Sequence, residues 1–223
     1  MGLAYIKLLV PVCFSLSITA VCLFGSAGRL NWSNAWVLLG ISFIAGLAFT
    51  VGRNPELAAE RRNLKAGKNW DKVLVGITVL LGPMVVWITA GLDDRFHWSN
   101  GMSSVAFTAG VAVAVPAAAL IAWAMRANRF FSAVVRIQKD RGHAVVDGGP
   151  YRFVRHPGYA GMSLFTLGTP LILGTYWALA PAAVTASVIV IRTIMEDLTL
   201  HNELEGYADY ASRVRYRLLP GIW

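Results

Sequence analysis

Long apolar runs alternate with polar connections along most of this chain. A helix that crosses a bilayer needs about 17 to 25 mainly apolar residues. Six runs approach or reach this length, and they predict spans at residues 5–24, 35–51, 73–91, 102–125, 159–173 and 177–195. The fifth run is short and contains Gly168 and Pro170, so we expect it to tilt, kink or pair closely with the sixth. The pattern predicts an all-α, polytopic transmembrane bundle of five to six spans.

The composition agrees with this interpretation. Of the 223 residues, 56% are hydrophobic and 14% are charged, and the mean hydropathy is +0.55. Soluble domains carry about 25% charged residues. The first run has Lys7 as its one basic flanking residue, and it is longer than the apolar region of a secretory signal, so we expect it to be retained as a span.

The net charge of +8 is distributed unevenly between the predicted connections. With six spans, 18 of the 20 Lys and Arg residues fall on one side, in 52–72, 126–157, 192–223 and at Lys7. Basic residues gather on the cytoplasmic side of membrane proteins. The chain therefore predicts cytoplasmic N and C termini, and its basic character requires no nucleic-acid partner.

The sequence lacks the patterns that indicate several common kinds of site. Cys13 and Cys22 fall in one predicted helix, roughly 13 Å apart along its axis, too far for a disulfide between them. No Cys and His cluster predicts a metal site. The nucleotide-binding patterns GxxxxGK[ST] and GxGxxG and the hydrolase patterns HExxH and GxSxG are also missing.

The predicted organisation is a single integral domain over 1–223, with N-terminal spans in 1–125 and a loop, the last spans and a tail in 126–223. The connection GRNPELAAERRNLKAGKNWDK is interpreted as a cap and a short helix, or as a solvated connector on anionic headgroups. The next polar insertion is expected to continue the fourth span, then to turn through DGGP and again through HPG. Long loops of fixed geometry often hold ligands.

The segment GPYRFVRHPGYAG, residues 149–161, is polar and rich in Gly and Pro between two apolar runs. Pro157 pushes His156 toward an extended backbone, which aims its imidazole. His156 is otherwise a helix cap, and Tyr151 and Tyr159 are otherwise interfacial aromatics. Glycines 148, 149, 158 and 161 favour close approach to a ligand.

The last span ends in IRTIMEDLTL, which places Arg192 and Glu196 on one helix face. Charges at this depth in a membrane indicate a functional site by default, with a structural ion pair as the alternative. The tail is expected to continue as a helix that ends at Pro220, with Leu198, His201, Leu204 and Glu205 on one face. Together with the insertion, this helix predicts a pocket at the cytoplasmic membrane surface.

The C-terminal half resembles the isoprenylcysteine carboxyl methyltransferase and phospholipid methyltransferase families of integral membrane enzymes. The resemblance is carried by IQKDRGHAVVDGGPYRFVRHPGYAG, IRTIMEDLTL and GYADY, with RHPxY followed by R-x3-E-[ED]-x2-L as its most specific pattern. It implies methyl transfer from S-adenosyl-L-methionine to a lipophilic acceptor in a pocket facing the cytoplasm. Asp197 stands where the second glutamate of the pattern is more usual.

The resemblance also implies residue roles. It implies cofactor contacts at Gln138, His143, Ala144, Val145, Val146, Tyr151, His156, Pro157, Gly158, Tyr159 and Glu196. Arg192 matches the substrate-binding arginine, so Arg192 and Glu196 are the predicted catalytic pair, without a metal. A carboxylate acceptor is ionised at neutral pH and needs no general base, and Arg192 is suited to clamp it.

Two other classes of function compete with a methyltransferase. NADPH-dependent sterol reductases share an RHPxY-like loop and an ending similar to RVRYRLLPGIW, but the Cys and Lys-Tyr-Gly of their tail are absent from HNELEGY, residues 201–207. The other alternative is a non-enzymatic membrane scaffold. Among methyl acceptors, a carboxylate on a prenylated or other lipid-like molecule is favoured, and a phospholipid amine or a small lipophile stays open.

Overall fold

The computed structural model describes residues 2–50, 61 and 67–223. The described chain is helical and contains no strand. Its long helices are α1 (Gly2–Ala27), α2 (Ser33–Thr50), α5 (Gly82–Phe96), α6 (Ser104–Ala127), α7 (Pro157–Leu173) and α8 (Leu179–Glu203). Shorter elements are α4 (Asn69–Val75), the π-helical η2 (Gly76–Leu81), the 3₁₀ turns η3 (Lys139–Arg141) and η4 (Gly149–Arg152), and α9 (Tyr207–Arg213).

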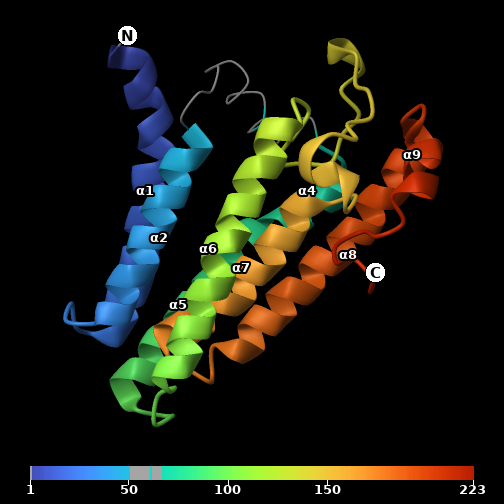
Figure 1. Cartoon of the computed structure of the whole chain (residues 1–223). Coiled ribbons are helices and arrows are strands. Elements are labelled where there is room, and N and C mark those ends of the chain that lie inside the picture. The colour runs from blue at the N-terminus through green and yellow to red at the C-terminus, as the bar shows by residue number, and fades with distance from the viewer. Residues whose placement is uncertain (1, 51–60, 62–66) are drawn as a thin grey trace.

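The helices run side by side in a bundle (Figure 1). Five segments are long and apolar enough to cross a membrane, namely Leu9–Ala27, Ser33–Thr50, Asn69–Phe96, Ser104–Ala127 and Leu179–Glu203. Helix α7 has 17 residues, or about 26 Å at 1.5 Å per residue, and packs between α6 and α8. The prediction of an all-α bundle with five to six spans is therefore confirmed.

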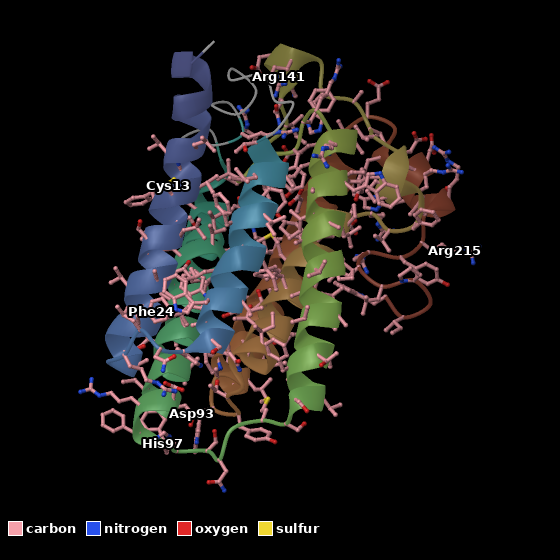
Figure 2. The ribbon with its side chains drawn as sticks, turned by 60° about the vertical axis from the view of Figure 1, so that its left-hand side comes forward. Cys13, Phe24, Asp93, His97, Arg141 and Arg215 are labelled. Atoms are coloured by element: carbon pink, nitrogen blue, oxygen red, sulfur yellow. The ribbon has the colours of Figure 1, made fainter. Side chains whose placement is uncertain are left out.

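The bundle has two unlike ends. One end, which we call the loop end, carries the segment 128–156 and α9, and α1 begins and α8 finishes there (Figure 1). The opposite end carries the connections 28–32, 97–103 and 174–178. Figure 2 shows Arg141 at the loop end and Asp93 and His97 at the opposite end. The apolar core gathers toward the opposite end, around Leu23, Trp32, Val86 and Ile172.

Small residues allow the helices to approach closely. A Cβ atom on Gly110 of α6 would lie 2.7 Å from the backbone nitrogen of Ile172 in α7. One on Gly161 of α7 would lie 2.8 Å from the carbonyl oxygen of Ala117 in α6. Close backbone contact through small residues is a usual means of packing helices in a bilayer. This contact fixes the position of α7 against α6, and therefore also the position of the first turn of α7 at the loop end.

The third pass changes its helical form on the way through the bundle. It starts as α4, becomes the π-helix η2 and continues as α5, whose first turn contains Pro83. A Cβ on Gly82 would lie 2.5 Å from Thr185 Oγ1 of α8, so the chain is also tightly packed there. Short π-helical segments are frequent near functional sites. Here the segment sets the position of Asp71 relative to α8.

Two expectations for the polar insertions are wrong. The fourth span does not continue into the second insertion, because α6 ends at Ala127 and Asn128 has extended backbone angles (φ −112°, ψ 108°). The tail helix does not run to Pro220, because α8 ends at Glu203 and Gly206 reverses the chain with a φ of 77°. The short helix predicted in the first insertion falls mostly on 51–60 and 62–66, outside the described residues.

The expected turn through DGGP is confirmed. It forms η4, where Gly149 has a φ of 59°. The extended backbone expected for His156 is wrong, because α7 starts at the next residue, Pro157, and His156 has φ −127° and ψ 61°. Both cysteines are free.

The α6–α7 contact provides a test of the bundle. In Gly161→Val the new Cβ would lie 2.6 Å from Ile121 Cγ1 as well as against the Ala117 carbonyl. We expect it to destabilise the protein by about 1–3 kcal/mol, the usual cost of overpacking, measured as a lower melting temperature in detergent. Gly40→Val is the matched control, because a Cβ at Gly40 meets nothing within 4 Å. Equal losses in both variants would contradict this account of the contact.

Candidate active site

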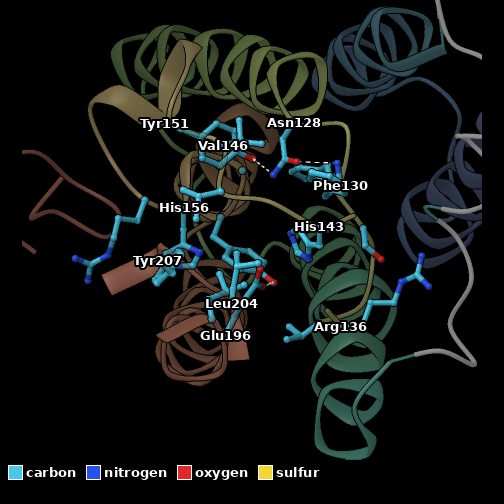
Figure 3. A pocket seen from close by; sticks show the side chains of 18 of the residues that line it. Asn128, Phe130, Arg136, His143, Val146, Tyr151, His156, Glu196, Leu204 and Tyr207 are labelled. Atoms are coloured by element: carbon cyan, nitrogen blue, oxygen red, sulfur yellow. Dashed lines mark hydrogen bonds between the residues drawn. The ribbon is translucent and has the colours of Figure 1, made fainter. Parts of the chain in front are cut away.

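A cavity of about 260 Å³ lies at the loop end. Its walls come from the segment 128–156, from the first turn of α7, from α8 and from the tail. Figure 3 shows these side chains turned toward one another, with Asn128, Tyr151 and His143 from the loop and Glu196, Leu204 and Tyr207 from α8 and the tail. Segments far apart in the sequence therefore meet around one space.

Most of the predicted site residues line this cavity. The lining includes His143, Ala144, Val145, Val146, Tyr151, His156, Gly158, Tyr159, Arg192 and Glu196. Gln138 and Pro157 do not line it. Pro157 is the first residue of α7, and Gln138 is 1% exposed beneath the loop.

Gln138 holds the loop together from within. Its side-chain Nε2 donates to the carbonyl of Phe130 at 2.6 Å, and its Oε1 accepts from Arg141. Its backbone N–H donates to His143 Nδ1 at 3.2 Å. These contacts place Phe130 and His143, which line the cavity with their rings tilted by 39° and their centroids 4.5 Å apart. A direct cofactor contact of Gln138 stays a prediction.

Asp197 is 1% exposed and is the centre of a hydrogen-bond network beside the cavity. Its carboxylate accepts from Nε and Nη2 of Arg155 at 2.9 and 3.0 Å and from Nε of Arg217 at 2.9 Å. It also accepts from the hydroxyl of Tyr207 at 2.7 Å and lies 3.1 Å from His156 Nε2. One carboxylate thus joins α8 to the RHPxY loop and to the tail.

Arg155 extends this network into the tail. Its Nη1 lies within 3.4 Å of the carbonyl oxygens of Ala211, Val214 and Arg215. The backbone N–H groups of Arg155 and His156 donate to the carbonyls of Tyr216 and Arg217, each at 2.9 Å. Thus the segment 214–217 lies beside the RHPxY loop and fixes its backbone. The ending RVRYRLLPGIW therefore has a structural role that the sequence pattern did not reveal.

Arg192 forms a second buried ion pair, with a residue that the sequence did not point to. Its Nε and Nη2 donate to the two carboxylate oxygens of Asp71 at 2.6 and 3.1 Å, and Nη2 also donates to the Ala133 carbonyl at 2.6 Å. Arg192 is 3% exposed and Asp71 is fully buried. The guanidinium carbon lies 5.1 Å from the centre of the Tyr159 ring. Arg192 is therefore held rigidly at the cavity wall.

These bonds limit how Arg192 can meet a ligand. Two of its three nitrogens are already engaged by Asp71 and Ala133, and the structure gives Nη1 no hydrogen-bond partner among the described residues. A carboxylate acceptor would meet one donor nitrogen unless Asp71 moved.

Glu196 lies one helical turn after Arg192 and is half-buried. The Tyr159 hydroxyl donates to its Oε2. The His156 and Tyr159 rings stack with centroids 5.9 Å apart, so the loop and α7 present these groups as one unit. The cavity thus has a carboxylate with a single hydrogen-bond donor beside a fixed guanidinium.

Aromatic wall residues were missed from the sequence. Phe130, Phe131, Tyr207 and Tyr210 all line the cavity. A Cβ on Gly158 would lie 2.8 Å from Phe131 Cε2, so only glycine leaves room for that ring. Phe130 and Phe131 follow a helix, and the apolar character of this stretch led to its interpretation as part of a span.

Comparison with known proteins agrees with this arrangement. The model of the phospholipid methyltransferase family matches residues 105–204, from α6 to the end of α8. This segment of the chain is similar to that family. The predicted resemblance is confirmed.

Curated relatives carry names of the same kind. Protein-S-isoprenylcysteine O-methyltransferase of Schizosaccharomyces pombe is 36% identical over 52 residues, 23% of this chain and 22% of the relative. Two Arabidopsis thaliana proteins, protein-S-isoprenylcysteine O-methyltransferases B and A, are 28% and 33% identical over 94 and 91 residues, in each case 40% of this chain and 46% of the relative. The chain spans less than half the length of these relatives.

The Asp197 network gives a testable prediction. Asp197→Asn would leave Arg155 and Arg217 without their shared carboxylate, and breaking a buried pair typically costs about 3–5 kcal/mol. We expect a matching fall in the free energy of unfolding. Asp94→Asn is the control, because its partner Arg29 has a half-exposed side chain, and exposed pairs contribute about 0–1 kcal/mol. A loss in Asp197→Asn no larger than in the control would contradict the proposed importance of the network.

His143 gives a prediction on pH. Burial, helped by the nearby cations Arg136 and Arg141, lowers the pKa of His143 below its ordinary 6.5. The unfolded chain then binds this proton more readily, so the free energy of unfolding falls as pH drops below about 6.5 toward the folded pKa. We expect wild type to lose more stability between pH 7.5 and 5.5 than His143→Asn, by thermal melting. Equal losses would show that His143 does not carry the effect.

Proposed function

We propose that this protein is a membrane methyltransferase that binds S-adenosyl-L-methionine and a lipophilic acceptor in the cavity beside Glu196. The observation that carries the proposal is the meeting of the RHPxY loop with Arg192 and Glu196 around one space. All of these residues fall within the segment that matches the phospholipid methyltransferase family. The names of the curated relatives support transfer of a methyl group to a lipophilic molecule.

The residues around the cavity fit this cofactor. It carries a sulfonium cation, an amino acid group and an adenine ring. Glu196 offers a half-buried carboxylate to the cation, and the rings of Phe130, Tyr207 and Tyr210 offer faces for adenine. The volume of about 260 Å³ is just below the usual range of small-molecule sites, roughly 300–1,000 Å³. When bound, the cofactor would supply an electrophilic methyl group.

The chain itself would contribute position and electrostatics. The hydroxyl of Tyr159 keeps one oxygen of Glu196 fixed, and Asp71 fixes the guanidinium of Arg192. Methyl transfer is an in-line displacement, so holding the two reactants at a short distance gives much of the rate. The apolar and aromatic walls exclude water from the same space.

A carboxylate acceptor suits this site best. It is already ionised at neutral pH and needs no proton removed, and the remaining nitrogen of Arg192 can donate to it. An amine or hydroxyl acceptor would need a base, and Glu196 or a neutral histidine of the cavity, His143 or His156, would have to take that role. We therefore propose a carboxylate on a lipid-like molecule as the acceptor, with the loop end facing the cytoplasm as the basic residues predict.

Binding of the cofactor tests the proposal directly. We expect calorimetry on detergent-purified protein to detect binding of S-adenosyl-L-methionine. Glu196→Gln should weaken this binding about 10-fold or more, because hydrogen bonds to charged groups contribute about 1.5–3 kcal/mol. Glu203→Gln is the control, since Glu203 is on the same helix but pairs with Lys68 and does not line the cavity.

Three other results would count against the proposal. Binding of NADPH in place of S-adenosyl-L-methionine would favour a reductase. Binding of neither by folded protein would favour a scaffold. Equal losses of affinity in both glutamate variants would show that Glu196 is not at the cofactor.

A further inference from the structure

A second cavity lies inside the bundle and is larger than the first, at about 440 Å³. Its lining comes from α1, α2, α5, α6 and α7, together with Arg61, Phe131 and Ala133. Apolar side chains dominate its lining, including Leu16, Phe49, Trp87, Ile121 and Phe165. Its apolar walls suit a hydrocarbon chain. Neither the match to the family nor the predicted site residues explain this cavity.

Among the described residues, Arg61 is the cation that lines this apolar space. Arg61 is 7% exposed, and its Nη2 donates to the carbonyls of Met125 and Asn128 at 2.7 and 3.0 Å. Its Nε is buried and has no hydrogen-bond partner among the residues that the structure describes. No acidic side chain of the described residues forms an ion pair with it. A buried donor and charge left unmatched are costly, which indicates that an anionic group belongs beside Arg61.

The surroundings of Arg61 raise this cost further. Burial lowers the pKa of Arg61, and the nearby cation Arg141 acts in the same direction. An anion would reverse both effects by matching the charge. A neutral lipid would fill the apolar space but would leave the cation unmatched.

We propose that this cavity binds a single-chain lipid anion, with its chain among α1, α2, α5 and α6 and its oxyanion on Nε of Arg61. The apolar lining matches the hydrocarbon chain of such a molecule, and the unmatched donor of Arg61 matches its oxyanion. Fatty acids and isoprenoid acids have this chemistry. The chain lies in the bundle and the charge lies at the loop end, as an amphiphile in a bilayer would also arrange them.

The second cavity adjoins the first. Phe131 and Ala133 line both. The Ala133 N–H donates to the carbonyl of Arg61 at 2.8 Å, and its carbonyl accepts from Arg192 at 2.6 Å. A lipid anion on Arg61 is therefore separated from the candidate active site by one short segment. Its identification with the class of the methyl acceptor rests on the proposed function, whereas its binding does not.

Equilibrium binding of radiolabelled palmitate to the detergent-purified full chain tests the site. We expect saturable binding that hexadecanol, with the same chain and no charge, competes for at least 10-fold less well. Arg61→Gln should weaken palmitate binding about 10-fold or more. Arg126→Gln is the matched control, because Arg126 is an arginine in the last turn of α6 that also donates to a backbone carbonyl, that of Ala48, but lines neither cavity. It should change the affinity less than about 2-fold.

A second variant covers the case in which Arg61→Gln fails to fold. Ala118 lines the cavity away from Arg61, and Ala118→Phe fills it, so we expect palmitate binding to be lost. Equal binding of palmitate and hexadecanol, or unchanged palmitate affinity in folded Arg61→Gln or Ala118→Phe, would overturn the proposal. S-adenosyl-L-methionine binding, measured in parallel, reports on the first cavity, so failure of the lipid site is distinguishable from failure of the proposed function.

Discussion

The buried carboxylate of Asp197 is the interaction on which the loop end depends. Arg155, Arg217, Tyr207 and His156 all converge on its two oxygens. Each comes from the RHPxY loop or from the tail. Without the shared anion, the guanidinium groups of Arg155 and Arg217 would repel one another in a poorly hydrated place. The cavity walls therefore owe their arrangement to a residue that is not among those lining the cavity.

The Asp71–Arg192 pair has a related role between the two halves of the chain. Asp71 precedes the π-helical segment of the third pass, and its Oδ2 also accepts the Val135 N–H at 2.5 Å. The pair thus holds α4, α8 and the loop segment 133–135 together. Asp71 lies outside the residues that match the family. The first half of the chain accordingly contributes a charge to the candidate active site as well as spans.

The sequence predicted the helices and much of the cavity for physical reasons. Apolar runs report membrane helices directly, and the RHPxY and R-x3-E patterns are local enough to read along the chain. Asp71 was not predicted because it is 121 positions from Arg192, and no spacing rule links them. Phe130 and Phe131 were misassigned because apolarity alone does not show where α6 ends. The second cavity depends on how five helices pack, which no single run of residues encodes.

The dependence of the RHPxY loop on the tail also bears on how the protein is made. Residues 214–217 leave the ribosome after α8, and their backbone carbonyls and Arg217 complete the contacts of Arg155 and His156. Domains form in the order of synthesis, N-terminal parts first. The helices of this protein can enter the membrane during translation, but the loop end takes its final form only after the tail has been synthesised. A chain released before the tail is made would therefore be inserted and still lack the completed loop end.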